Sequence, residues 1–397
     1  MITTINNKHK KLNVPNLRFP EFQGEWEKCK VSDLLDFYST NSLSWDKLEY
    51  GTDAIQNLHY GLIHVGLPTM IDLSKDKLPN ITNGNTPKNY ELCQEGDIAF
   101  ADASEDTNEV AKAVEFYKLN GKDVICGLHT IHGRDNQQKT VVGYKGYAFS
   151  STAFHHQIRR IAQGTKIYSI NSKNFSECYI GIPSKEEQKK IATLLRLIDE
   201  RIATQNKIID KLQSLIKGFR NDVFGKLRKN IGFNAVVGDV FDYEQPQSYI
   251  VEDTEYTNEG TPVLTANKAF VLGYTLETDG IYDKGDCIIF DDFTLDCKYV
   301  DFPFKVKSSA IKILTAKNKE LLRYTFEFLK YLDLSTEEHK RHYIAETQNQ
   351  EIILPTEQMV KTIAHIFSTL SLRMETAVKQ KNVFEKQKQY LLRQMFI

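Results

Sequence analysis

The sequence has no excess of charge of either sign, no cysteine framework and no long apolar run. Its 397 residues hold 51 Lys and Arg against 52 Asp and Glu, so bulk charge does not indicate binding to nucleic acid. No apolar run approaches the roughly 18 residues that a membrane-spanning helix needs, and the polar N-terminus lacks the apolar core of a signal peptide. The six cysteines include no CxxC pair. We therefore expect no membrane contact, free thiols and a cytoplasmic location.

Motifs for catalysis are also missing. No GxxxxGK[ST] loop indicates a nucleotide motor. Cys126, His129 and His132 offer three metal ligands, but no fourth is evident, and residues of an extended segment point to both faces, so we expect no metal. The segment Asp301–Phe304 departs from an amino-methyltransferase motif at its second position, and no glycine-rich cofactor loop accompanies it. An enzyme in its own right is therefore the weakest interpretation.

The strongest feature that is present is an internal repeat with a shift of 172 residues. Ile180-Gly-Ile-Pro183 aligns with Ile352-Ile-Leu-Pro355, and Ile191-Ala192 aligns with Ile363-Ala364. After each of these segments, apolar residues recur at steps of three and four, which is the coiled-coil pattern. The expected helix–helix contacts are Ile191, Leu195, Ile198, Ile202, Ile209, Leu212, Ile216 and Phe219 in the first copy and Ile363, Phe367, Leu370, Met374, Phe384 and Leu391 in the second.

The first helix has a well-marked start. Ser184 and Glu187 have the spacing of a capping box, and residues 184–220 would form a rod of roughly 55 Å. In the second helix Lys381 and Lys388 fall on the apolar stripe, which predicts looser packing.

The segments before the helices repeat more faintly. Val31–Phe37 resembles Val237–Tyr243, and Gly96–Phe100 resembles Gly285–Phe290, all with a turn-then-strand pattern. The sequence therefore predicts an α+β fold with two globular domains and two long helices, related by an internal repeat. The expected boundaries are 1–182 and 230–354 for the domains and 183–229 and 355–397 for the helices.

This order of segments resembles the specificity subunit of type I restriction–modification systems. The motifs that carry the resemblance are Ile180–Ala192 with its Pro183, Glu187-Gln188 and Ile191-Ala192, then Gln163–Ile170, Phe302–Ser309 and Pro15–Trp26. The second half departs from the pattern. Glu357-Gln358 comes two residues early, Ser371 replaces Asp199, and the second domain has no Gln-Gly-Thr segment.

The resemblance implies a non-catalytic subunit with two target-recognition domains, each reading one half of a split double-stranded DNA sequence. It implies two antiparallel coiled-coil helices that set the gap between the half-sites and dock two methyltransferase subunits, with motor-nuclease subunits joining them. S-adenosylmethionine and ATP with Mg²⁺ would belong to the partners, and none to this chain. Two alternatives stay open: a stand-alone bipartite DNA-binding regulator, which would bind unaided, and a scaffold whose second domain holds protein.

Charge differs between the segments. The helical segment 183–229 has 12 Lys and Arg against 6 Asp and Glu, and 355–397 has 7 against 3, whereas 230–354 has 12 against 22. Because phosphate neutralisation supplies much of the affinity for DNA, the acidic second domain needs clustered lysines or help from its partners.

DNA contacts are expected where basic, amide, aromatic and hydroxyl side chains gather on loops. In the first domain these are Gln56, Asn57, His59, Tyr60, Arg134, Asn136, Gln138, Lys139, Arg159, Arg160, Thr165, Lys166 and Tyr168. In the second domain they are Thr265, Asn267, Lys268, Lys305, Lys307, Ser308, Lys340, Arg341, His342 and Tyr343.

Overall fold

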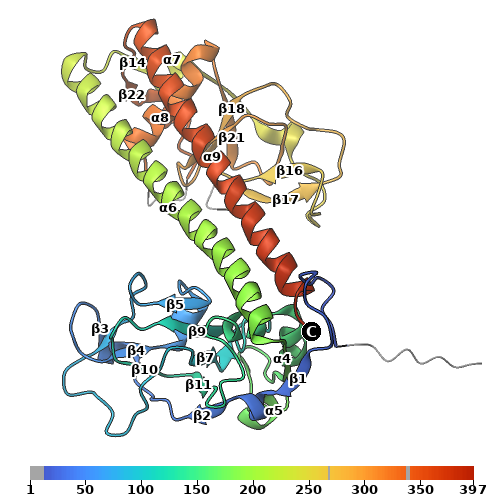
Figure 1. The fold of residues 1–397 in the computed structure, drawn as a ribbon. Coiled ribbons are helices and arrows are strands. Elements are labelled where there is room, and N and C mark those ends of the chain that lie inside the picture. The colour runs from blue at the N-terminus through green and yellow to red at the C-terminus, as the bar shows by residue number, and fades with distance from the viewer. Residues whose placement is uncertain (1–12, 267–268, 337–339) are drawn as a thin grey trace, which may run out of the picture. The chain divides into compact units, whose positions relative to one another are not determined.

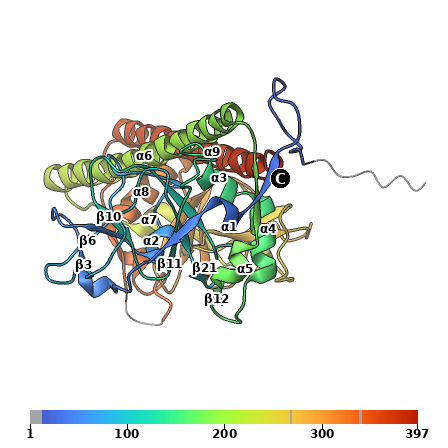
Figure 2. The same cartoon turned by 60° about the horizontal axis from the view of Figure 1, so that its bottom comes forward.

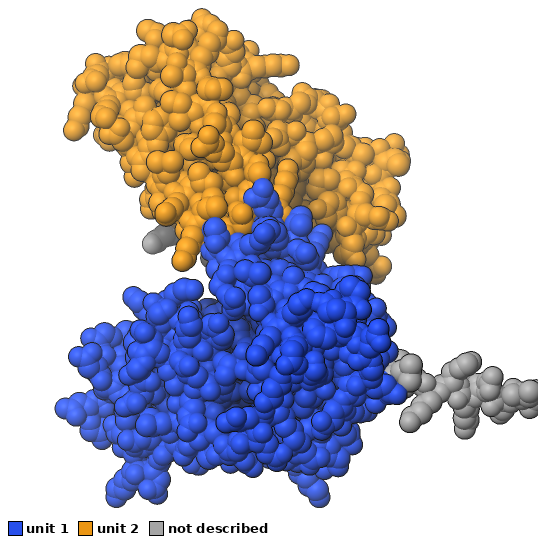
Figure 3. Space-filling view, viewed as in Figure 1, with its two compact units in different colours: residues 1–204, 380–397 blue, residues 205–379 orange. Residues whose placement is uncertain are grey.

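The computed structural model describes residues 13–266, 269–336 and 340–397. The chain forms two compact units (Figure 3): unit 1 is residues 1–204 with 380–397, and unit 2 is residues 205–379. Each long helix is divided between the two units. Among the described residues, no helix has the length and apolarity needed to cross a membrane.

Unit 1 is built on a five-stranded and a four-stranded sheet. The first has the order β2-β11-β7-β9-β5, with only β5 and β9 parallel, and the second has the order β10-β4-β6-β3, with β10 and β4 parallel. The strands of these sheets are β2 (Asp36–Tyr38), β3 (Leu48–Glu49), β4 (Gln56–Leu58), β5 (Met70–Asp72), β6 (Asn80–Ile81), β7 (Ile98–Ala101), β9 (Ala113–Lys118), β10 (Val124–Cys126) and β11 (Thr130–Arg134).

Two strand pairs and several short helices complete unit 1. The pairs are β1 (Glu27–Lys30) with β13 (Tyr179–Ile182) and β8 (Ala103–Ser104) with β12 (Tyr168–Ser169), both antiparallel. The short helices are α1 (Val31–Leu34), η1 (Trp45–Lys47), α2 (Tyr60–His64), α3 (Lys145–Phe149), α4 (Thr152–Ile161) and α5 (Ser172–Ser176).

Unit 2 repeats this topology. Its four-stranded sheet β15-β21-β18-β19 matches β2-β11-β7-β9, and its three-stranded sheet β17-β16-β20 again contains one parallel pair, β16 with β20. Its strands are β14 (Ala235–Val236), β15 (Phe241–Glu244), β16 (Thr261–Leu264), β17 (Val271–Thr275), β18 (Cys287–Asp291), β19 (Cys297–Val300), β20 (Lys305–Val306), β21 (Ile311–Ala316) and β22 (Glu351–Ile352). Its short helices are α7 (Val237–Val240), η2 (Pro246–Tyr249), η3 (Lys319–Leu321), α8 (Leu322–Leu332) and η4 (Thr347–Asn349).

The central strand of each unit is buried on both faces. Because successive side chains of a strand point to opposite faces, Ile98 and Phe100 of β7 enter one apolar cluster, while Ala99 and Ala101 enter another. In β18, Ile288 and Phe290 enter one cluster, while Cys287 and Ile289 enter a second. The faint sequence repeat at these two strands therefore reflects the same two-sided packing.

The long helices α6 (Lys185–Asn230) and α9 (Glu357–Gln394) are antiparallel in each unit (Figure 1). In unit 1 the start of α6 lies against the end of α9, where Lys388 Nζ is 2.6 Å from Asp199 Oδ1. In unit 2 the end of α6 lies against the start of α9, where the rings of Phe219 and Phe367 are 5.0 Å apart. The predicted α+β fold with antiparallel long helices is confirmed.

The predicted apolar stripe occupies these helix contacts. None of its fourteen residues is exposed, and twelve belong to the two cores that the helices share with the domains. The remaining two, Ile209 and Leu212, are half-buried in the middle of α6. Lys388 does not simply loosen the stripe, because its ammonium group is paired with Asp199 and lies 5.6 Å from the ring centre of Tyr147.

The start of α6 differs from a capping box in one respect. Ser184 Oγ accepts a hydrogen bond from the backbone N–H of Glu187 at 3.3 Å, as expected, but the Glu187 carboxylate binds the Arg18 guanidinium instead of returning to the cap. Gln188 is fully buried and bonds to the backbone of Val141 and Lys139. The Glu-Gln pair therefore ties the helix to two other segments of unit 1.

The last residues of the chain complete the core of unit 1, beside β1 and α4 (Figures 1 and 2). The ring of Phe396 lies 6.4 Å from that of Trp26 and 6.0 Å from that of Tyr144. Gly181 is required here because a Cβ at this position would lie 2.4 Å from Ile397 and 2.6 Å from Trp26. The Ile-Gly-Ile-Pro motif is thus a packing site for the end of α9.

Candidate nucleic-acid interface

Two of the predicted DNA contacts, Gln56 and Asn57, are in the core. The prediction of a loop at this position is wrong, because these residues form β4, which lies between β10 and β6. Gln56 is 8% exposed and Asn57 is fully buried, with its Oδ1 accepting a hydrogen bond from Asn41 Nδ2 at 2.7 Å. A polar run that ends in glycine looks like a surface turn, but here the amides are enclosed by neighbouring strands.

The prediction that His59 is a surface contact is also wrong, because the residue is buried below Tyr60. It is 3% exposed and caps α2, since its Nδ1 accepts a hydrogen bond from the backbone N–H of Gly61 at 3.1 Å. Burial lowers the pKa of His59, which favours the neutral ring needed for this acceptor role. The ring of Trp45 packs on it with centroids 4.5 Å apart. His59 therefore fixes the start of α2, and Tyr60 is the first residue beyond it that reaches the surface.

Arg134 is an internal anchor. It belongs to β11 and not to a loop, and its guanidinium binds both carboxylate oxygens of Asp97, at 2.9 and 2.8 Å. Burial alone would raise the pKa of Asp97, but hydrogen bonds from His132 and Arg134 outweigh burial and hold the pKa below its ordinary value. The prediction that Arg134 is a surface contact is therefore wrong, because its charge is neutralised inside the fold.

The turn after β11 keeps its predicted side chains at the surface. Asn136 and Gln138 are exposed, and the Nδ2 of Asn136 donates to Asp36 Oδ2 at 2.7 Å. Lys139 is half-buried and donates to the carbonyl of Asp33 at 3.2 Å. These three residues lie together and are accessible, although two of them are already held by neighbours.

The Gln-Gly-Thr segment forms a projecting turn. Gln163 and Ser169 exchange two backbone hydrogen bonds, at 2.9 and 2.8 Å, which close the turn at its base. Gly164 has φ +137°, and a Cβ there would lie 1.9 Å from the carbonyl oxygen of Ile167, so only glycine fits. Residues 163–169, called here the Gly164 turn, expose Thr165 and Lys166, with Tyr168 half-buried.

Two arginines from α4 are also at the surface of unit 1. Arg159 and Arg160 are exposed in the last turn of the helix. Arg159 contacts His156 Nδ1 at 2.7 Å and Asn108 Oδ1 at 3.1 Å. The structure therefore supports accessibility for this pair, as the sequence predicted.

A pocket of about 570 Å³ lies beside the Gly164 turn. It brings Ile167 of this turn to the same hollow as Tyr60, although the two are more than 100 residues apart. The ring of Tyr60 lies 5.9 Å from that of His64 and 5.1 Å from that of His129. The full lining of this Tyr60 pocket is Tyr60, His64, Ala103, Ser104, Glu105, Asp106, Glu109, Lys112, His129 and Ile167.

Three residues of this pocket were missed by sequence reasoning, as was the exposed Trp45 that packs on His59. Ile167 and Trp45 are 62% and 46% exposed, and exposed large apolar side chains give no sequence signal of their own. His64 lies one helical turn after Tyr60, a spacing that could have indicated a shared face. His129 reaches the pocket because it adopts φ +53° and contacts Asp102 Oδ1 at 3.1 Å.

In unit 2, four of the predicted contacts are internal, and Lys305 and Thr265 are the first two. Lys305 is 3% exposed, with its Nζ 2.6 Å from Glu277 Oε2 and 2.7 Å from the carbonyl of Asp279. Thr265 is 8% exposed. The prediction of surface contacts is wrong at both positions, because Lys305 pairs with Glu277 inside the fold and Thr265 is buried directly after β16. Asn267 and Lys268 lie outside the described residues.

The segment 340–343 has two exposed and two buried residues. His342 and Tyr343 are buried: the backbone N–H groups of both donate to Asp292 Oδ1, and the ring of Tyr343 packs between Tyr243 and Phe290. These two predicted contacts are therefore core residues. Lys340 and Arg341 are exposed.

The exposed members of two predicted clusters meet on unit 2. Arg341 Nη2 lies 3.4 Å from Ser309 Oγ, which places segment 340–341 beside the exposed Lys307 and Ser308. The backbone N–H of Lys307 bonds to the carbonyl of Leu264, so the end of β16 adjoins this surface. We call Lys307, Ser308, Lys340 and Arg341 the Arg341 patch.

Comparison with known proteins identifies the kind of domain. Residues 77–214 match the family described as the type I restriction modification DNA specificity domain. The EcoR124I/EcoR124II specificity subunit of Escherichia coli, a type I restriction enzyme, is 46% identical over 126 residues, which cover 30% of this chain and 31% of that protein. The type I restriction enzyme MjaX specificity subunit of Methanocaldococcus jannaschii is 26% identical over 223 residues, which cover 55% of this chain and 50% of that protein.

These curated relatives are matched over only part of their length. The chain spans about a third to a half of each. The solved S subunit of a type I restriction–modification system from M. genitalium covers 97% of this chain and 99% of its own, with a TM-score of 0.65 and 16% identity, which shows a shared fold. The resemblance to type I specificity subunits that the sequence motifs indicated is confirmed.

Proposed function

We propose that this chain is the DNA sequence-specificity subunit of a type I restriction–modification complex, because residues 77–214 match the family described as the type I restriction modification DNA specificity domain. The family match carries the proposal, and the repetition of the domain topology in unit 2 extends it to a second reader. Each unit reads one half of a bipartite double-stranded site, and α6 and α9 set the gap.

The catalytic parts of this complex are its partners. Two methyltransferase subunits dock on the helices and hold S-adenosylmethionine, and motor-nuclease subunits supply ATP- and Mg²⁺-dependent cleavage. The chain itself contributes recognition and no catalysis, and it acts in the cytoplasm. The basic composition of both helical segments gives them surfaces suited to acidic partner faces or to phosphate.

In unit 1, the Tyr60 pocket and the Gly164 turn form the reading surface. Lys166, Arg159 and Arg160 are suited to phosphate, which positions a protein on the duplex without specifying sequence. Ring and hydroxyl groups of the pocket are suited to base edges, and its carboxylates can accept a hydrogen bond from the amino group of cytosine. This combination of positioning and reading groups on one surface is what a half-site reader needs.

In unit 2, the Arg341 patch takes the same role. Arginine can form two hydrogen bonds to guanine, and Lys307 adds a cation for phosphate. Lys305 adds none, because Glu277 neutralises it internally. Because residues 230–354 are acidic, unit 2 depends on this small patch and on partner subunits for its affinity for DNA.

Methylation mapping tests the proposal. The chain is co-expressed with its cognate methyltransferase subunit in a host without adenine methylation, and modified adenines are mapped across the genome. We expect two short specific blocks separated by a fixed gap. New methylation that lacks a split motif, or none at all from a complex shown to be assembled, would contradict the proposal. Binding of the site by the chain alone would indicate a regulator instead.

A further inference from the structure

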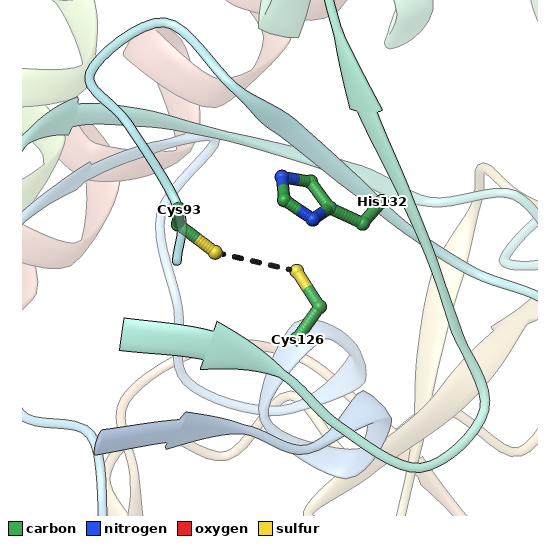
Figure 4. A group of neighbouring side chains, drawn as sticks. All are labelled: Cys93, Cys126 and His132. Carbon is green, nitrogen blue, oxygen red and sulfur yellow. Dashed lines mark hydrogen bonds between the residues drawn. The ribbon is translucent and has the colours of Figure 1, made fainter. Parts of the chain in front are cut away.

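Three metal-binding side chains meet in the core of unit 1. Cys93 precedes β7, Cys126 ends β10 and His132 lies in β11, and all three are buried. Their ligand atoms lie within 4.8 Å of one another, and the two sulfur atoms are 3.6 Å apart. Figure 4 shows the three side chains pointing toward one another, with one ring nitrogen of His132 facing the sulfurs.

The histidine is oriented as metal-binding histidines are. Its Nε2 bonds to Asp97 Oδ2 at 2.7 Å, and Arg134 holds the same carboxylate from the other side. A carboxylate that accepts the proton of one ring nitrogen leaves the lone pair of the other nitrogen for a metal ion. That other nitrogen, His132 Nδ1, is buried and has no hydrogen-bond partner among the described residues. A buried polar atom without a partner is costly, and a cation would satisfy it.

We propose that Cys93, Cys126 and His132 Nδ1 bind a thiophilic divalent cation of the zinc class. Tetrahedral zinc with Zn–S bonds of about 2.3 Å places two sulfurs about 3.8 Å apart, close to the 3.6 Å found here. On binding, each thiol loses its proton to solvent and each sulfur forms one bond to the metal, so no oxidant or reductant is needed. Two thiolates balance the charge of a dication, and the Asp97–Arg134 pair is already neutral.

The site would join the two sheets of unit 1. Cys126 belongs to the four-stranded sheet through β10, and His132 belongs to the five-stranded sheet through β11. The chain between these ligands contains His129, which lines the Tyr60 pocket. The cation would therefore fix the base of a segment that reaches the proposed reading surface, although the site itself does not depend on the proposed function.

The local sequence pattern, in which we expected no metal, contains a different third residue. Cys126, His129 and His132 form the local pattern, but His129 faces Asp102 at the surface, while Cys93 comes from 33 residues upstream. This difference provides a matched control. The variant His129→Gln removes the ligand chosen by spacing, and His132→Gln removes the one chosen by the structure.

Metal analysis of the full chain tests the proposal. Protein purified without added metal, and protein reconstituted with Zn²⁺, are analysed for zinc by mass spectrometry, with cobalt as an optical probe of thiolate ligation. We expect about one zinc per chain in the parent, in His129→Gln and in Cys178→Ser, whose buried cysteine lies outside the cluster. We expect at least a tenfold loss in Cys93→Ser, Cys126→Ser and His132→Gln. A strong chelator should lower the Tm of the parent by about 5 °C.

Three outcomes would overturn the site. One is a folded parent that binds no zinc and gives no cobalt–thiolate absorption after reconstitution under reducing conditions. Another is zinc retained in both Cys93→Ser and His132→Gln, with circular dichroism showing folded protein. If Cys93 and Cys126 resist alkylation until they are reduced, the pair is a disulfide and the metal proposal fails. If one cysteine variant does not fold, His132→Gln and the cobalt spectrum decide.

Discussion

At the residue scale, burial separates the cations that hold the fold from those that can meet phosphate. Arg134 and Arg160 have the same chemistry, but only Arg160 is exposed, and Arg134 is fixed to Asp97. Arg134→Ala should destabilise the protein by about 3–5 kcal/mol, because the buried Asp97 carboxylate loses its guanidinium partner and keeps only neighbours such as His132. Arg160→Ala should change stability by less than about 0.5 kcal/mol and reduce the salt slope of DNA binding by about one.

Chemical denaturation and salt-dependent binding of the assembled complex measure these two effects. A stable Arg134→Ala protein would show that the ion pair is dispensable. An unchanged salt slope in Arg160→Ala would remove α4 from the DNA surface.

A comparison of the exposed Lys307 with the buried Lys305 tests unit 2 in the same way. Lys307→Glu reverses an exposed charge of the Arg341 patch, so it should leave the Tm within about 2 °C and abolish methylation that depends on one half-site. Lys305→Glu buries a second carboxylate against Glu277, so it should prevent stable folding of unit 2. Thermal unfolding and methylation mapping report the two results. Normal methylation by Lys307→Glu would favour the scaffold interpretation.

These residues also show what the sequence could predict at this scale. The sequence indicated clusters of polar residues but could not tell which of their members are exposed. Arg134 meets Asp97 from 37 residues away, and Lys305 meets Glu277 from 28 residues away. Both pairings depend on strands whose neighbours are distant in the chain. Lys166 and Thr165 were more predictable, because Gly164 imposes a local turn.

At the scale of the element, the long helices are the features that local sequence determines best. Their apolar spacing repeats over many turns, so the pattern predicts one packed face without knowledge of the rest of the fold. β4 has only three residues, which are too few for an apolar pattern to repeat. The Glu187 contact with Arg18 was also beyond prediction, since the two side chains come from segments 169 residues apart.

The paired helices allow a test of the proposed gap. Four residues inserted after Thr204 in α6 and four after Lys379 in α9 add about 6 Å to each helix while keeping their contacts in register. The gap between half-sites should then grow by about 1–2 base pairs, because DNA rises about 3.4 Å per base pair. Genome-wide methylation mapping reads the gap directly, and an equal insertion at the exposed Asn120–Gly121 turn is the control. An unchanged gap in the double insertion would refute the ruler role.

At the scale of the whole molecule, unit 1 is discontinuous: residues 205–379 lie between its two parts in the sequence. Its core takes Leu391, Met395 and Phe396 from the end of the chain. Phe396→Ala should therefore destabilise unit 1 by about 3–4 kcal/mol, although it lies far from that unit's strands in sequence. The exposed Tyr390→Ala should have almost no effect.

Hydrogen exchange resolved by peptide distinguishes the two units in this experiment. Faster exchange is expected at β1 and β13, which adjoin the C-terminal residues, and unchanged exchange at β18 and β21. Equal loss of protection in both units would contradict the assignment of the C-terminal segment to the core of unit 1.

The discontinuity of unit 1 also bears on how the protein is made. A ribosome translates all of unit 2 before it reaches Leu391, Met395 and Phe396, so the first domain to begin synthesis is the last to receive its full core. Unit 2 can form its core from its own residues. At that stage Trp26 and Gly181 still lack the C-terminal side chains that pack on them. The core of unit 1 is therefore completed only after residues 391–396 have been translated, and thus after all of unit 2.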